Sequence, residues 1–294
     1  MWLVIDPTKM SATTPIFLDR PLRVLITNDD GPPGEESPFI EQFVEALEAI
    51  GWDVSVCIPD SQKSWLSKSF LIKDHVHTSF FHRDTNTISK TRRAASDWTL
   101  LSGTPATCVN IGLHHIFKNT QFDLVIAGPN FGSNSSTTYT LSSGTIGAAL
   151  DAALCSKKSI ALSFAFYSSD FKYSAIKNAC NMAIDVIVYL WKTNKWPENG
   201  LFNVNVPVVE GACPVKMTQI HRNFYGSLFK RVVEGDNEQN GKKILMDGDD
   251  AEYEVRTHVE TGDHQVSYRF APDVTSLLDP GNLPEGTDAW AVTD

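Results

Sequence analysis

The chain has 294 residues and a formal net charge of −10, and 42% of its residues are hydrophobic and 20% charged. This composition is ordinary for a globular protein and excludes a collagen-like, coiled-coil or largely disordered chain. The acidic balance argues against a nucleic-acid duplex as the partner, because proteins that bind duplexes gather Lys and Arg on one face. A small phosphorylated substrate stays compatible with it, since a bound cation can supply positive charge.

The first regular pattern follows a stretch without periodicity. Residues 1–21 are expected to form an N-terminal leader, and the β-branched run at residues 22–27 predicts a buried strand that ends in a turn at residues 28–31. Ser37, with Pro38 after it, can cap a helix, because the apolar residues that follow recur at helical spacing. A strand, a turn and a helix therefore open the ordered part of the chain.

Strands and helices alternate from there to residue 207. Apolar strands are predicted at residues 54–58, 98–101, 123–127, 159–166 and 201–206. Helices are predicted after Thr104 and Gly144, and a long helix carries the apolar positions from Ile176 to Leu190. Residues 61–97 show no clear period and are expected to be irregular. The alternation predicts an α/β fold over residues 22–207, with a mainly parallel sheet covered on both faces. Residues 208–294 change to short strands and acidic loops, which predicts a β-rich extension.

Three polar clusters follow strands of this predicted sheet, at the edge where open α/β sheets bind ligands. The first lies at residues 28–31, where the adjacent carboxylates of Asp29 and Asp30 repel each other unless a cation or protons compensate. On a turn, with Gly31 relieving the backbone, both carboxylates can converge on one hard cation. The alternative is an exposed turn, for which this sequence is equally suited.

The second and third clusters offer neutral oxygen atoms. Ser64 follows the second strand and can donate an oxygen ligand, and Lys63 beside it can meet a phosphate. Taken alone, this segment fits a solvated loop better. After the strand at residues 123–127, Asn130 offers a carbonyl ligand in a glycine-rich turn that ends at Gly132. Carboxylates and neutral oxygens together suit a divalent cation.

The third cluster continues into a helix start. Ser143 can cap the helix, and Gly144 and Thr145 form its first turn. The free amide groups and the dipole at such a start suit an anion, and a glycine lets a phosphate approach the backbone closely. The alternative is an ordinary capped helix without a ligand.

The motifs, in this order and spacing, resemble those of the SurE family (survival protein E), metal-dependent 5′/3′-nucleotidases that include fungal acid-phosphatase-like members. The resemblance rests on residues 26–31, 59–64, 102–109, 128–132 and 143–145. It covers residues 22–206 well and weakens afterwards, although residues 203–207 and Thr287-Asp288 also look like family landmarks. One such motif is weak, whereas five in order are specific.

The resemblance implies a three-layer αβα sandwich of Rossmann-like type that binds Mg or Mn. By position, the divalent cation would be held by Asp29, Asp30, Ser64 and Asn130, with the two aspartates as catalytic residues. The substrate-binding residues would be Asn28, Gly31, Lys63, Gly132, Ser143, Gly144 and Thr145. The C-terminal strands of the family take part in oligomers, so the resemblance also implies a homodimer or tetramer.

Some residues depart from the pattern of bacterial members. Trp65 stands where a small residue is usual, Pro129 replaces an aliphatic residue, and residues 66–97 hardly align. These features look more like the fungal branch. Family chains also usually run on into another strand after Thr287-Asp288, so the resemblance suggests that the chain stops short at Asp294.

The expected activity is hydrolysis of a phosphomonoester such as a nucleoside 5′- or 3′-monophosphate. A cation would polarise the phosphoryl group and lower the pKa of a bound water. The alternative is that one aspartate, Asp30 in preference to Asp29, acts as base or nucleophile instead, and the sequence does not choose between the two. A haloacid-dehalogenase-type phosphatase is disfavoured, because it needs two aspartates two residues apart and here they are adjacent. A nucleotide-binding or scaffold protein with weak turnover is the non-enzymatic alternative.

The expected compartment is the cytoplasm. No apolar run reaches the roughly 18–20 residues that span a bilayer, so no membrane partner is expected. The first residues lack the basic region of a secretory signal. The five cysteines are widely spaced and form no CxxC or Cys/His cluster, which favours neither zinc nor disulfides.

Overall fold

The computed structural model describes residues 18–166, 170–193, 195–232, 267–272 and 283–293. Its strands are β1 (Arg23–Thr27), β2 (Asp53–Pro59), β3 (Thr78–His82), β4 (Thr87–Ser89), β5 (Trp98–Leu101), β6 (Leu124–Phe131), β7 (Lys158–Ala165), β8 (Phe202–Pro207), β9 (Phe229–Val232) and β10 (Ser267–Phe270). Its α-helices are α1 (Ile40–Ala49), α2 (Pro105–Ile111), α3 (Ser136–Ser142), α4 (Gly144–Leu154), α5 (Tyr173–Thr193) and α6 (Asp288–Thr293), and a π-helix at Gly112–Ile116 continues α2.

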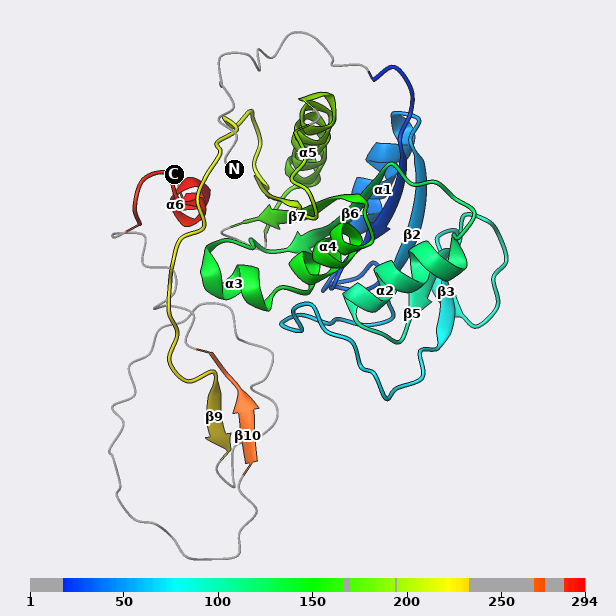
Figure 1. Ribbon diagram of the computed structural model, residues 1–294, viewed down its shortest axis with the longest axis horizontal. Helices are drawn as coiled ribbons and strands as arrows, with labels where there is room; N and C mark the ends of the chain where they lie inside the picture. The colour runs from blue at the N-terminus through cyan, green and yellow to red at the C-terminus, as the bar shows by residue number, and fades with distance from the viewer. Residues whose placement is uncertain (1–17, 167–169, 194, 233–266, 273–282, 294) are drawn as a thin grey trace, which may run out of the picture.

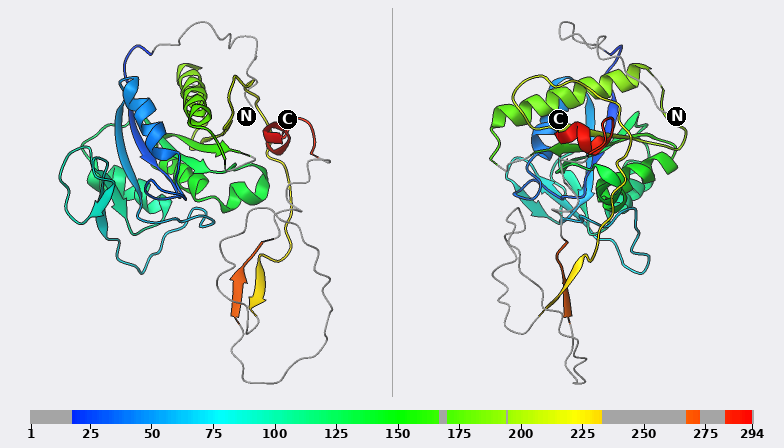
Figure 2. Two further views of the ribbon diagram at one scale, coloured as in Figure 1. Left: turned by 180° about the vertical axis from the view of Figure 1, so that it is seen from behind. Right: turned by 90° about the vertical axis from the view of Figure 1, so that its left-hand side faces the viewer.

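Eight strands form one sheet in the order β4-β3-β5-β2-β1-β6-β7-β8. Helices α1 and α5 cover one face of this sheet, and α2 and α4 cover the other (Figures 1 and 2). Alternate residues of β1 supply the two cores: Val24 and Ile26 pack with α1 and α5, whereas Leu25 packs with α2 and α4. The predicted α/β fold, a Rossmann-like three-layer sandwich, is confirmed.

The direction in which the strands are added reverses between β1 and β6. Both neighbours of β1 are parallel to it, with Ile26 level with Val56 of β2 and with Ile126 of β6. From β1 the chain builds outward through β2 to β5, and from β6 it builds the other way through β7 to β8. Such a reversal leaves a crevice beyond the carboxyl ends of the strands, where open α/β sheets bind ligands. The polar residues after β1 and in β6 meet at this crevice.

Two local expectations are wrong. Residues 61–97 contain the hairpin β3–β4, and β3 adds to β5 in antiparallel fashion, so the sheet is mixed at this edge. Ser37 does not cap α1, because Phe39 is the cap residue and makes no side-chain capping bond. The hydroxyl of Ser37 is used elsewhere: it donates to the carbonyl of Gly31 at 3.0 Å and accepts from Asn28 at 3.2 Å.

The predicted β-rich extension is described only in part. Strands β9 and β10 pair antiparallel as a separate two-stranded sheet, and residues 233–266 between them lie outside the described residues, as do residues 1–17 of the predicted leader. Asp288 of α6 accepts hydrogen bonds from the amides of Ser136 and His221, at 2.9 and 2.8 Å. These bonds tie the last described helix to the start of α3. No helix among the described residues is long and apolar enough to cross a bilayer.

Candidate active site

The turn after β1 places two carboxylates at the crevice. Asn28 braces the turn, since its amide nitrogen donates to the carbonyl of Gly31 at 2.8 Å and its amide oxygen accepts from the Gly31 N–H at 3.1 Å. Gly31 has φ +84°, a conformation that other residues adopt only with strain. Asn28 and Gly31 therefore build the turn that presents Asp29 and Asp30, both of which are buried.

Contacts from two other segments bring the predicted ligands together. The hydroxyl of Thr145 donates a short hydrogen bond to Oδ1 of Asp29, and the same hydroxyl lies 3.4 Å from Oδ1 of Asn130. The amide of Phe131 donates to Oδ2 of Asp30 at 2.8 Å. The side chains of Asp29, Asp30 and Asn130 thus gather where β1, β6 and α4 meet. The amide of Asn130 donates in turn to the carbonyl of Gly132 at 2.7 Å, which fixes its orientation.

Both carboxylates are held at an electrostatic cost. Burial raises the pKa of Asp29, and hydrogen bonding by Thr145 and the nearby backbone amides offsets this only in part. Burial, and then the charge of Asp29, raise the pKa of Asp30 well above its usual range. In the described part of the chain, no Lys, Arg or His side chain pairs with either group. Two adjacent buried acids without a basic partner are compensated either by protons or by a cation.

The start of α4 faces Asp29. Ser143 caps the helix, as predicted, by accepting from the amide of Ile146 at 3.1 Å. Gly144 leaves no room for a side chain, because a Cβ there would lie 2.7 Å from Cβ and 2.9 Å from Oδ2 of Asp29. The backbone amides of Gly144 and Thr145 lower the pKa of Asp29, so the positive end of the helix points into the crevice.

The loop after β2 lies against the same turn. The amide of Lys63 donates to the carbonyl of Asp29 at 2.6 Å, and its ammonium group donates to the hydroxyl of Ser61 at 2.9 Å. Ser64 is half-buried beside them. Among the described residues, its hydroxyl makes no hydrogen bond with Asp29, Asp30 or Asn130. The structure thus gathers three of the four predicted ligands and sets the fourth on the adjacent loop.

The donor chemistry fits a hard divalent cation. Two carboxylates and the neutral oxygen of Asn130 are the ligands that Mg and Mn take in proteins. The described residues contain no group of three or more His, Cys, Asp or Glu that could hold a metal, so a cation at this crevice depends on amide and hydroxyl oxygens as well. The contacts that orient the carboxylates, from Thr145 and from the Phe131 amide, could not be predicted because they join residues about a hundred positions apart.

A hollow of about 510 Å³ lies at the opposite edge of the sheet, at the amino ends of the strands. It is lined by Arg20, Pro21, Arg23, Asp53, Gln121 and Asp123. Its charged groups satisfy one another: Arg20 binds Asp123 through two hydrogen bonds of 2.8 and 2.7 Å, and Arg23 lies 3.5 Å from Asp53. Nothing in this hollow resembles the unbalanced charge at the crevice.

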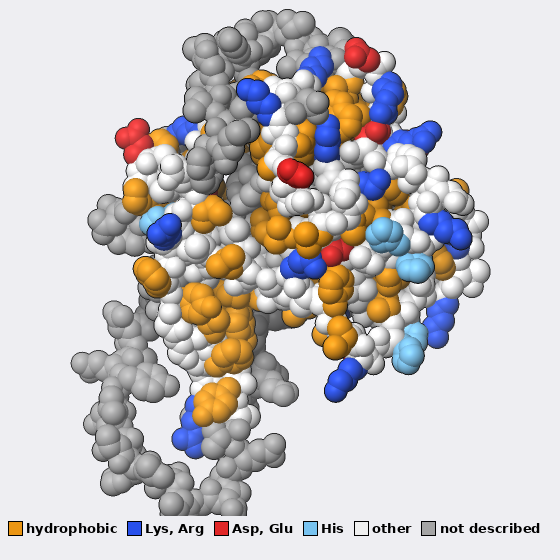
Figure 3. All heavy atoms as spheres, viewed as in Figure 1, with side chains coloured by type: hydrophobic (Ala, Val, Ile, Leu, Met, Phe, Trp, Pro, Cys, Tyr) orange, Lys and Arg blue, Asp and Glu red, His pale blue; other side chains and the backbone are white. Residues whose placement is uncertain are grey.

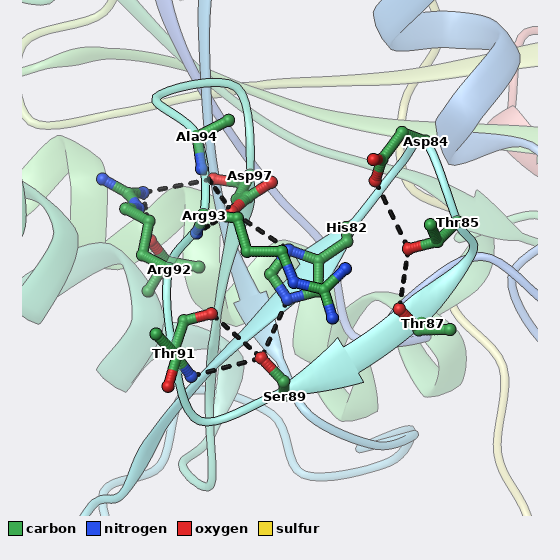
Figure 4. A network of polar contacts seen from close by, with 11 residues as sticks. His82, Asp84, Thr85, Thr87, Ser89, Thr91, Arg92, Arg93, Ala94 and Asp97 are labelled. Atoms are coloured by element: carbon green, nitrogen blue, oxygen red, sulfur yellow. Dashed lines mark hydrogen bonds and ion pairs between the residues drawn. The ribbon is translucent and has the colours of Figure 1, made fainter.

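A second polar network lies on the β3–β4 hairpin (Figure 4). Nε2 of His82 lies 2.8 Å from the hydroxyl of Ser89, and Nδ1 lies 3.0 Å from a carboxylate oxygen of Asp97. The order Ser, His, Asp is that of a hydrolase triad. However, His82 is fully buried, and the hydroxyl of Ser89 is bound to the backbone of Thr91 on both sides. The network therefore fastens the loop after β4 and exposes no nucleophile.

This network predicts a pH-dependent contribution to stability. Burial raises the pKa of Asp97, but hydrogen bonds from the amides of Ala94 and Arg93, with His82, outweigh burial and lower the pKa to about 2. A depressed pKa stabilises the fold above the unfolded value of about 3.9, and the effect is lost as pH falls towards 2. We expect Asp97→Asn to cost about 1–3 kcal/mol at pH 7. In urea unfolding, the difference in the free energy of unfolding between the wild type and Asp97→Asn should shrink below pH 4. A difference that stays constant with pH would contradict this.

Comparison with known proteins identifies the class to which this fold and crevice belong. The family model "Survival protein SurE" matches residues 24–227. A Synechococcus protein named 5′-nucleotidase SurE is 31% identical, with 71% of this chain and 72% of the relative covered. A Campylobacter hominis protein of the same name is 29% identical, covering 86% and 94%. The chain therefore belongs to the SurE family, which confirms the resemblance found in the sequence.

Two further comparisons limit what can be inferred from this similarity. A Saccharomyces cerevisiae protein named probable tubulin–tyrosine ligase PBY1 is 34% identical over 93% of this chain, but the chain spans only 39% of the yeast protein. The crystal structure of a SurE protein from Aquifex aeolicus is 23% identical, covers 92% of this chain and 89% of its own, and superposes with a TM-score of 0.58. At that identity, the superposition supports the fold alone.

Proposed function

We propose that the chain is a divalent-cation-dependent phosphomonoesterase that hydrolyses nucleoside 5′- or 3′-monophosphates and, in the manner of acid phosphatases, other phosphomonoesters. The observation that carries the proposal is the pair of buried carboxylates, Asp29 and Asp30, without a basic partner among the described residues. The bacterial SurE relatives support the reaction class, because their alignments cover most of both chains. The yeast relative is a weaker guide, since this chain spans 39% of it.

Each residue of the crevice has a proposed task. Asp29, Asp30 and Asn130 would hold Mg or Mn, and Ser64 would complete the donor set from its loop. When bound, the cation supplies charge that polarises the phosphoryl group and lowers the pKa of water. Thr145 and the Phe131 amide keep the two carboxylates oriented through their hydrogen bonds. Asp29 and Asp30 are the proposed catalytic residues.

The amino end of α4 would serve the substrate. Its amides at Gly144 and Thr145, which also act on Asp29, and the helix dipole would favour negative charge on the transferring phosphoryl group. The phosphoryl oxygens carry most of the charge in such a transfer, so positioning and electrostatic stabilisation do most of the work. Lys63, on the loop after β2, adds a positive charge that would meet the same group. Ser143 contributes by capping the helix that presents these amides.

A substrate panel on the purified protein tests the proposal. Phosphate release is measured with AMP, 3′-AMP and p-nitrophenyl phosphate, with Mg or Mn and then with EDTA. We expect release that stops with EDTA and returns when the cation is restored. Release that is insensitive to EDTA would overturn the cation dependence. Tight nucleotide binding without release would instead favour the alternative of a binding or scaffold protein.

We also propose that the chain is a homodimer or tetramer. Large apolar side chains are exposed along the segment that leads to β9 and on the paired strands β9 and β10, where they gather at the lower left of Figure 3. They are Met217, Ile220, Phe224, Tyr225, Phe229, Tyr268 and Phe270. Such a patch normally marks an interface. We expect Phe224→Asp, which places a charge at an 89% exposed position, to reduce the mass seen in sedimentation; an unchanged oligomer would contradict this.

A further inference from the structure

A buried acid on α4 lies outside the crevice and has no part in the proposed chemistry. Asp151 is 4% exposed, and its carboxylate lies 3.1 Å from the ammonium group of Lys68. The amide of Asn110, on α2, lies 3.5 Å from its other oxygen. Lys68 belongs to the loop that carries Lys63 and Ser64. A buried charge is costly unless it is paired, so the burial of Asp151 and its pairing with Lys68 call for a structural or functional explanation.

The same loop is fastened at two more points. The amide of Ser67 donates to the carbonyl of Ser142 at 2.9 Å, and its hydroxyl donates to the carbonyl of Leu141 at 2.7 Å. Two residues further along the loop, the carbonyl of Ser69 accepts a hydrogen bond from the hydroxyl of Thr104 at 2.6 Å. The two bonds of Ser67 lay the loop across the junction between α3 and α4, immediately before the helix start that faces Asp29, and the bond at Ser69 ties the loop to the cap of α2.

The loop backbone touches α4 directly. A Cβ added at Gly147 would lie 2.3 Å from the carbonyl oxygen of Ser67 and 2.6 Å from the amide nitrogen of Lys68. Ser67 holds this course with φ +54°, a left-handed conformation that is uncommon for a residue with a side chain. Strain of this kind persists only where the surroundings hold it in place. Gly147 and Ser67 are thus fitted to one another.

We propose that Lys68 and Asp151 are positioning residues that fix the loop bearing Lys63 and Ser64 against α4. Helix α4 carries Thr145 in its first turn, where it binds Asp29, and Asp151 further along, where it binds the loop. The far end of the loop returns to Asp29 through the amide of Lys63. One rigid helix therefore sets the carboxylate turn and the loop in register. The role of this register in turnover rests on the proposed function, whereas the placement of the loop does not.

Hydrogen exchange measures the placement without any substrate. The amides of Lys63 and Ser67 are protected by the carbonyls of Asp29 and Ser142, so peptides covering residues 61–70 report on the loop. We expect Asp151→Asn and Gly147→Ala each to speed this exchange by about tenfold or more. Leu150→Ala, on the exposed side of α4, is the matched control and should leave it unchanged. Because alanine favours a helix over glycine, Gly147→Ala should not melt α4 itself.

Kinetics then separate a positioning role from a merely structural one. We expect Asp151→Asn to lower kcat/KM about tenfold and to raise the Mg concentration for half-maximal rate, with circular dichroism unchanged. Lys68→Arg in the wild-type background keeps a cation opposite Asp151, so both values should stay near those of the wild type. Normal exchange in Asp151→Asn and Gly147→Ala would overturn the proposal, as would faster exchange with unchanged kinetics. If the wild-type protein releases no phosphate, the proposed function fails alone, and the exchange result still decides whether Lys68 and Asp151 hold the loop.

Discussion

Asp29→Asn and Asp30→Asn should each lower the kcat/KM for cation-dependent phosphate release by about 10³-fold or more, which is about 4 kcal/mol of transition-state stabilisation. Each change replaces a charged ligand by a neutral one of the same shape, so it weakens the cation site without disturbing the packing. The turn should survive, because it is braced by Asn28 rather than by either carboxylate. The measurement is a Mg titration of initial rates for wild type and both variants.

Measurements of the free energy of unfolding distinguish the loss of the cation site from unfolding of the variant. Without a cation, Asp29 and Asp30 repel each other in a buried site, so removing one charge should leave the free energy of unfolding in EDTA equal to or above that of the wild type. Asp53→Asn, an exposed carboxylate at the amino end of β2, is the control and should change neither activity nor stability by much. Wild-type turnover in both Asp29→Asn and Asp30→Asn would contradict the assignment.

The features that could be predicted from the sequence are those that depend on neighbours along the chain. Thr104 was expected to begin a helix, and in the structure its hydroxyl accepts from the amide of Thr107 at 3.1 Å. Ser143 was expected to do the same and does. The strand at β1 shows the apolar run that a strand buried on both faces requires. Local patterns also placed the polar clusters at the carboxyl edge, since parallel strands bring those ends together.

The features that could not be predicted depend on contacts between distant segments. Strand β3 is stabilised by pairing with β5, which no periodicity in its short sequence reveals. Strand β6 runs on to Phe131 through a bulge after Ala127, beyond the predicted end, because β7 beside it continues the pairing. Ser37 has the chemistry of a helix cap, but the turn at Gly31 competes for its hydroxyl. In each case, a tertiary contact overrides a local preference.

The candidate site divides in the same way. The types of donor at Asp29, Asp30 and Asn130 follow from the sequence, and the topological rule predicts that they are close. The need for a glycine at position 144 could not be predicted from the sequence, because a helix start usually accepts any small residue there. Only the packing of Asp29 against the helix backbone shows that this position must lack a side chain.

Gly144→Ala should therefore disturb the candidate site although it adds only one methyl group. The added Cβ would meet Cβ and Oδ2 of Asp29 at 2.7 and 2.9 Å, so either the carboxylate turn or the start of α4 has to move. We expect kcat/KM to fall by about 10²-fold or more, since a displacement of about 1 Å is enough for such a loss. We also expect overpacking to cost about 1–3 kcal/mol of unfolding free energy. Gly34→Ala is the matched control, because a Cβ there meets nothing nearer than 3.9 Å. Normal kinetics in Gly144→Ala would show that the amino end of α4 and Asp29 do not form one catalytic unit.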